Sequence, residues 1–122
     1  MATYTATTGT CGRLADAAEL IGGCAPGVEW GRTHEWTELA DGFEPEWVGW
    51  MLEHFGAEMS NPLKTAFVRA AAREPLYAAA LWHDGEGLTV AQYALLAEAA
   101  SGYYTSFGEH VRDRQPGWRR HV

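Results

Sequence analysis

The sequence is poor in cysteine, in basic residues and in long apolar runs, and each shortage excludes a class of protein. Its two cysteines, Cys11 and Cys24, are too few to staple a small secreted fold with disulfides. No apolar run approaches the roughly 18 residues of a membrane-spanning helix, and the N-terminus lacks the charged-then-apolar pattern of a secretion signal. We therefore expect a cytoplasmic protein with reduced thiols and no membrane association.

Basic residues are outnumbered, with nine Lys and Arg against 16 Asp and Glu, so the net charge is −7. Such a chain lacks the general basic surface that attracts nucleic acids or anionic lipids, and we expect no direct nucleic-acid binding. Between residues 28 and 58, eight acids accompany Arg32 alone, whereas residues 109–122 carry four arginines and two acids. Either the acidic middle pairs with the basic tail and keeps the chain soluble, or it forms an acidic face for a partner's basic groove.

Apolar residues at helical spacing are plentiful. With 122 residues, 47% of them hydrophobic, the chain is long enough for one domain with a single core. The pattern is strongest in residues 41–59, where Trp47, Met51 and Phe55 fall on one helical row. Pro45 suits the first position of a helix, where no backbone N–H is needed. We predict that this segment is the central helix of a small bundle.

The same periodicity and the helix-end signals place the remaining elements. Thr89 and Gln92 form a capping box at the start of the last helix, and Asn61 is the predicted cap of an earlier one. The predicted helices cover residues 12–21, 33–40, 45–59, 62–74, 76–83 and 89–114, and residues 24–31 are predicted to be a loop.

Strand signals are nearly absent, so the sequence predicts an all-α fold, a compact bundle of five or six helices. The threonine-rich residues 1–10 are predicted to be a flexible N-terminal arm, residues 11–115 a single helical domain, and residues 116–122 a basic C-terminal tail. The segment Leu76–Trp82 is apolar on all sides, which places it in the interior or at a subunit contact.

Two His-x-x-x-Glu pairs, His34 with Glu38 and His54 with Glu58, suggest the ligands of a metal-carboxylate bundle. The Glu-x-x-His motif of di-iron bundles is missing, however, and so is His-Glu-x-x-His. We therefore expect no metal, no other cofactor and no catalytic residue. A helical metal-binding enzyme that uses these four residues is the alternative hypothesis.

Residues 24–56 resemble a pattern found in small uncharacterised phage and prophage proteins. The shared features are aromatic spacings: Cys24-x-x-Gly27-x-x-Trp30, a threonine-led helix at Thr33, Trp47-x-x-Trp50, and Phe55-Gly56. That family has no assigned activity, so the resemblance implies no site residues. It implies a context, because small acidic phage proteins often bind and block a host machine, including restriction and CRISPR effectors.

Charge and resemblance together lead to the main hypothesis, a non-enzymatic phage-type protein that inhibits a host defence or nucleic-acid-handling protein in the host cytoplasm. This anti-CRISPR or anti-restriction type of inhibitor would bind a basic surface of its partner by electrostatic steering and aromatic contacts. A homodimer with a structural or regulatory role, joined through Leu76–Trp82, is a third hypothesis. The residues predicted to contact the partner are Glu29, Trp30, Glu35, Trp36, Glu38, Asp41, Glu44, Glu46, Trp50 and Glu53.

Overall fold

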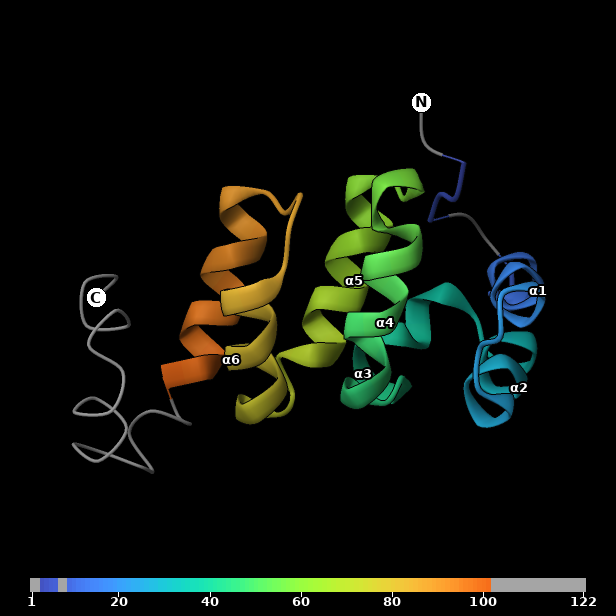
Figure 1. The fold of residues 1–122 in the computed structure, drawn as a ribbon, viewed down its shortest axis with the longest axis horizontal. Coiled ribbons are helices and arrows are strands. Elements are labelled where there is room, and N and C mark those ends of the chain that lie inside the picture. Colours follow the sequence, from blue (N-terminus) through green and yellow to red (C-terminus); the bar gives the residue numbers. More distant parts are fainter. Residues whose placement is uncertain (1–2, 7–8, 102–122) are drawn as a thin grey trace.

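The computed structural model describes residues 3–6 and 9–101 and shows them to be mainly helical (Figure 1). Including a further α-helical segment at residues 90–101, the described residues form seven α-helices, against the five or six helices expected. Apart from the isolated bridges of Tyr4 with Met59 and Thr10 with Glu35, the described residues contain no strand, so the predicted all-α class is confirmed. The other helices are α1 Gly12–Leu20, α2 Ala25–Thr33, η1 Trp36–Glu38, α3 Leu39–Gly42, α4 Pro45–Phe55, η2 Gly56–Glu58, α5 Asn61–Ala71 and α6 Pro75–Asp84, where η marks a 3₁₀-helix.

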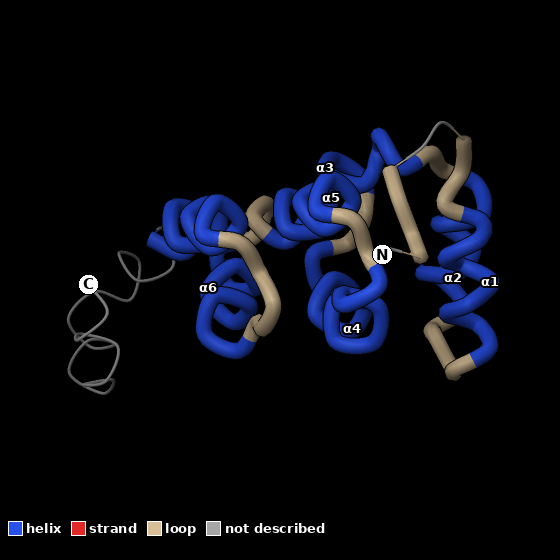
Figure 2. Tube along the Cα trace, turned by 90° about the horizontal axis from the view of Figure 1, so that it is seen from above, coloured by secondary structure: helices blue, strands red, loops and turns tan. Residues whose placement is uncertain are grey.

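The helices follow one another along the longest axis of the molecule (Figures 1 and 2). The α1–α2 hairpin lies at one end, α3, α4 and α5 lie in the middle, and α6 with residues 90–101 lies beyond them. α5 packs against α3, α4, α6 and η1, and it buries seven of its 11 residues, whereas α4 buries four of 11. The central helix is therefore α5 and not the predicted α4.

α4 itself begins as the sequence predicts, with Pro45 at its first position. Its apolar row also faces inward, because Val48, Met51 and Phe55 are buried. The two indoles are less enclosed, and Trp47 and Trp50 are half-buried against the edge of the core. They therefore border the space between α4 and the α1–α2 hairpin instead of filling the centre.

Polar side chains define the helix starts in the second half of the chain. Ser60, not Asn61, caps α5, because its Oγ accepts the Leu63 N–H at 3.4 Å. The predicted capping box is confirmed: the Gln92 N–H donates to Thr89 Oγ1 at 3.1 Å, and the Thr89 N–H donates to Gln92 Oε1 at 2.9 Å. The continuation of this last helix to residue 114 lies outside the described residues.

Residues 24–31 differ from the predicted loop, because residues 25–31 belong to helix α2 and Cys24 is its N-cap. Pro26 lies in the first turn, where a missing N–H costs little, and Val28 and Gly31 are buried. Two glycines make this helix intrinsically weak. Packing against α1 therefore supplies the stability that the local sequence lacks.

The chain next to the N-terminus contacts the body at Tyr4. The Tyr4 N–H donates to the Glu58 carbonyl at 2.9 Å, and its carbonyl accepts the Ser60 N–H at 2.8 Å. Its ring meets Phe55 edge to face, with centroids 5.8 Å apart. This described part of the predicted arm is thus bound along the η2–α5 junction, and the predicted tail lies outside the described residues.

The apolar segment on α6 is only partly enclosed. Ala78, Ala79 and Leu81 face the core, but the first turn leaves Leu76 52% and Tyr77 36% exposed. Burial of the whole segment, one of the two predicted placements, is therefore not observed. The other placement, a subunit contact, stays a prediction.

Candidate functional site

The predicted acids include four that recur at every third residue along η1, α3 and the residues that flank them. Glu38 and Asp41 lie on helical backbone, where residues three apart share one side, whereas Glu35 and Glu44 are the extended residues that precede η1 and α4. Leu39 and Phe43, which alternate with the series, are buried, and α3 packs on α5, so the acids point away from the core. All four side chains are exposed. We call this set the acidic row, and its members are Glu35, Glu38, Asp41 and Glu44.

The other predicted contact acids are also at the surface. Glu29 is exposed on α2, and Glu46 and Glu53 are exposed on α4. They extend the negative charge from the acidic row toward both neighbouring helices.

The three predicted contact tryptophans are half-buried. Trp30 stacks on His34, with ring centroids 4.1 Å apart and planes within 2°. Trp50 lies against His54 at 4.5 Å and meets Phe55 at 6.1 Å. Trp36 borders a small hollow of about 90 Å³ beside the N-terminal segment. Each indole therefore offers a partner only part of its ring.

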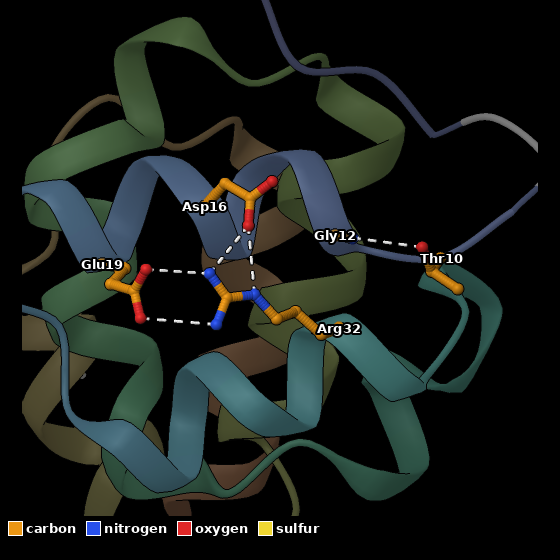
Figure 3. Close-up of polar contacts among 5 residues, drawn as sticks. All are labelled: Thr10, Gly12, Asp16, Glu19 and Arg32. Carbon is orange, nitrogen blue, oxygen red and sulfur yellow. Dashed lines mark hydrogen bonds and ion pairs between the residues drawn. The ribbon is translucent and has the colours of Figure 1, made fainter.

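Arg32, the sole Lys or Arg between residues 28 and 58, is engaged by α1 (Figure 3). Its Nε and Nη2 donate to Asp16 Oδ1 at 3.0 and 2.9 Å, and its Nη1 and Nη2 donate to the Glu19 carboxylate at 3.3 and 2.9 Å. These bonds raise the pKa of the Arg32 guanidinium and lower the pKa of the Glu19 carboxyl. Arg32 therefore joins α2 to α1 and is not available to neutralise the acidic row.

The histidines of the alternative metal hypothesis stay apart. His34 Nε2 is 3.9 Å from Glu38 Oε2, too far for a hydrogen bond, and its Nδ1 lies 2.8 Å from the Trp30 carbonyl. The part of the chain that the structure describes holds no group of three or more His, Cys, Asp or Glu residues that could surround a metal ion. The two His-x-x-x-Glu pairs are thus not brought together.

A cavity of about 320 Å³ lies between the α1–α2 hairpin and the α3–α5 body, and we call it the interhelical cavity. Small residues of the hairpin line one part of it, among them Ala15, Ala18, Gly22, Gly23, Gly27 and Gly31. Large aromatic side chains line another part, namely Trp30, Phe43, Trp47, Trp50 and Phe67. Polar side chains in the lining are few, and they are Cys11, Cys24 and Glu46.

Phe43 organises the aromatic part of the lining. It meets Trp30 at 5.3 Å, Trp47 at 5.2 Å and Phe67 at 5.2 Å between ring centroids, with the planes 70–88° apart in each pair. Edge-to-face pairs of this kind are favourable beyond the area that they bury. The aromatic wall is therefore held in one arrangement.

The size of the cavity is notable for a small domain. At roughly 24 cal/mol per Å³, an enclosed void of 320 Å³ would cost about 8 kcal/mol, as much as the whole stability of many domains, about 5–15 kcal/mol. Cys24, Gly22 and Glu46 are lining residues that are also exposed, so the cavity opens to the surface and avoids that cost. The cavity is therefore accessible from solvent.

No known protein family, curated protein or solved structure matches this chain. The resemblance to phage proteins thus stays a prediction from residue spacing. Among the described helices, none has the length and apolar character needed to cross a membrane.

The interhelical cavity is the part of the site that sequence reasoning missed. A signal was present, since Ala15 with Ala18 and Gly27 with Gly31 place small residues one turn apart on two consecutive segments. The segment of Gly27 and Gly31 was predicted to be a loop, however, so the sequence did not indicate that these residues form a helix surface facing Ala15 and Ala18.

Proposed function

We propose that this protein is a non-enzymatic interaction protein that binds the basic surface of a partner protein through the acidic row. The observation that carries the proposal is the placement of four exposed carboxylates on a segment whose opposite side is fixed in the core. The Glu38 N–H donates to the Glu35 carbonyl at 2.9 Å, and the Phe43 N–H donates to the Leu39 carbonyl at 3.1 Å. Glu38 and Asp41 therefore sit on packed helical backbone, and Glu35 and Glu44 flank it.

The acidic row is unfavourable for the isolated protein. Like charges one helical turn apart cost about 0.2–0.5 kcal/mol per pair, and Glu38 with Asp41 forms one such pair. A surface selected for stability alone would intersperse both signs. A basic partner would remove this repulsion on binding and would associate faster through electrostatic steering.

The spacing of the row favours a partner that handles nucleic acids. Three residues advance about 4.5 Å along an α-helix and about 6 Å along a 3₁₀-helix, so Glu38 and Asp41 are closely spaced negative charges, and the exposed Glu35 and Glu44 flank them. Phosphates on one strand of DNA follow each other every ~3.4 Å along the axis. A groove that holds such a strand fits a similar line of negative charge, and occupation of that groove would inhibit the partner. Host restriction and CRISPR effectors are partners of this kind.

Charge reversal of the row tests the proposal directly. The test variant carries Glu35, Glu38, Asp41 and Glu44 changed to Lys. The control reverses four exposed acids elsewhere, Glu74, Asp84, Glu86 and Glu98, and therefore has the same net charge. Both variants are first checked for helical content by circular dichroism. They are then compared with the wild type by quantitative mass spectrometry of proteins captured from a lysate of the cells that make the protein.

We expect the wild type and the control to capture a nucleic-acid-binding protein that the row variant does not capture. Added duplex DNA should displace this captured protein. Because the attraction is electrostatic, capture should also weaken as salt rises. Equal capture by all three proteins at physiological salt would contradict the proposal.

A second candidate function is a homodimer formed through α6. The observation in its favour is the exposure of two large apolar neighbours, Leu76 and Tyr77, in the first turn of that helix. Light scattering at high protein concentration measures the mass in solution. A dimer that the Leu76→Glu variant dissociates would support this function, and a monomeric wild type would exclude it.

A further inference from the structure

The interhelical cavity has an uneven charge balance. Glu46 is the only residue with a formal charge at neutral pH among the described residues that line it, and that lining contains no Lys, Arg or His. Aromatic rings present a negative face, which attracts cations within about 6 Å. A positively charged group is therefore favoured beside the Glu46 carboxylate, which would repel an anion.

The size and the walls of the cavity restrict the ligand further. Its volume of about 320 Å³ is roughly twice that of an engineered ~150 Å³ apolar cavity that stays dry and binds benzene. Because one benzene ring occupies the smaller cavity, a body of two fused rings fits this one. The aromatic wall around Phe43 suits a flat apolar body, because stacked and edge-to-face contacts are both open to it.

We propose that the interhelical cavity binds a small organic cation, with a body of about two fused aromatic rings among the tryptophans and an ammonium group beside the Glu46 carboxylate. This site goes beyond the proposed function, because no member of the acidic row lines the cavity. Binding of the cation and binding of a basic protein partner can therefore succeed or fail independently.

Three naphthalene derivatives that differ in charge test the proposal. Naphthylethylamine is the cation, its N-acetyl derivative is a neutral ligand with the same ring body, and naphthylacetate is the anion. Each is titrated into ¹⁵N-labelled protein. The signals to follow are the backbone amides of Gly27 and Gly31 and the indole N–H of Trp47, since all three residues line the cavity.

The amine should shift these signals with a Kd of about 1 mM or tighter, which is what a ligand of this size reaches at ordinary efficiency. The acetylated compound should bind about tenfold more weakly, a difference of about 1.4 kcal/mol, and the anion should give no shift. Equal affinity for the amine and its acetyl derivative, or no shift with the amine at several millimolar, would overturn the proposal.

Two carboxylates on α4 supply a matched pair of variants. Glu46→Gln removes the charge from the lining, whereas Glu53→Gln removes a charge that is also exposed on the same helix but lies outside the lining. The preference for amine over acetylated amine should fall roughly three- to fivefold in Glu46→Gln, as expected for a solvent-accessible ion pair, and stay unchanged in Glu53→Gln. The same change in both variants, or in neither, would overturn the role of Glu46.

A cavity-filling variant locates the site independently. Ala18 lines the cavity, and Ala18→Leu would place a branched side chain in the space. If this variant folds, it should lose naphthylethylamine binding, and retained affinity would overturn the location. If it does not fold, the comparison of Glu46→Gln with Glu53→Gln still decides, because both of those residues are exposed and neither belongs to the core.

Discussion

Two helical glycines, Gly31 in α2 and Gly49 in α4, should respond in opposite directions to the same change to alanine. A Cβ atom added to Gly31 would lie 2.9 Å from the Ala15 Cβ and 3.6 Å from the Cys11 carbonyl oxygen. A Cβ added to Gly49 would have nothing within 4 Å. The pair therefore separates the intrinsic effect of the substitution from the effect of packing between α1 and α2.

The magnitudes follow from these two environments. Alanine is favoured over glycine in a helix interior by about 1 kcal/mol, and Gly49→Ala should keep most of that gain. This gain would raise the Tm by about 2–5 °C for a domain of this size. Gly31→Ala gains the same propensity but overpacks the α1–α2 contact, which costs about 1–3 kcal/mol. Because the obstruction is a Cβ atom close to the backbone, no rotamer change relieves it, and the net effect should be a loss of up to ~2 kcal/mol.

Thermal and urea unfolding, followed by circular dichroism, measure both variants against the wild type. The order of stability should be Gly49→Ala, wild type, Gly31→Ala. A Gly31→Ala protein as stable as Gly49→Ala would refute the reasoning. It would mean that α1 and α2 are farther apart than the 2.9 Å between the added Gly31 Cβ and the Ala15 Cβ implies. The geometry of the interhelical cavity, which Gly31 lines, would then be wrong as well.

Three further changes test the core and the cavity wall. Gln92→Ala removes a fully buried amide that bonds the Thr89 N–H and Thr65 Oγ1, and urea unfolding should show a loss of about 3 kcal/mol. Lys64→Met keeps the apolar stem but leaves the Gly87 carbonyl without its 2.9 Å donor, for a loss of about 1 kcal/mol in the same assay. Burial, and secondly the charge of Glu38, raises the pKa of the Cys11 thiol from 9.0 to about 11, so the folded protein holds a proton that the unfolded chain releases. Stability should therefore fall between pH 9 and 11, by roughly 1 kcal/mol more in the wild type than in Cys11→Ala after a discount for the partial exposure of the thiol, and equal pH profiles would contradict this.

Sequence reasoning succeeded where a local chemical rule decides the structure. Pro45 at the start of α4 and the reciprocal bonds of Thr89 with Gln92 depend on residues within one turn, so their patterns alone predict them. Where two neighbours compete for one role, the rule is less sharp. Ser60 and Asn61 are both good caps, and the structure uses Ser60.

The errors arose where tertiary packing overrides local preference. α2 contains Pro26, Gly27 and Gly31, which together indicate a loop, yet Gly31 is the residue that lets α2 approach Ala15 of α1. The central helix was misassigned for a related reason. Residue size favoured the tryptophans of α4, whereas the alanines of α5 allow neighbouring helices to pack closely on several sides.

The two parts of the candidate site differ in the same way. The exposure of the acidic row was predictable, because charged side chains stay at the surface. A cavity has no such pattern, since it is defined by what facing elements fail to fill. Its aromatic side was visible in the sequence as Trp47 and Trp50, but the small residues of the hairpin gained meaning only when placed opposite them.

The α1–α2 hairpin beside the interhelical cavity is fixed by polar bonds between its two helices and by the edge-to-face contact of Trp30 with Phe43 in the aromatic wall. The Cys11 N–H donates to the His34 carbonyl at 3.0 Å, which joins the start of α1 to the end of α2. Arg32 joins the same two helices through Asp16 and Glu19. The Trp36 N–H bonds the Gly9 carbonyl at 3.4 Å, so the segment before α1 is also attached to η1. A ligand therefore meets a site that is already formed, so the loss of freedom that normally opposes binding falls on the ligand alone.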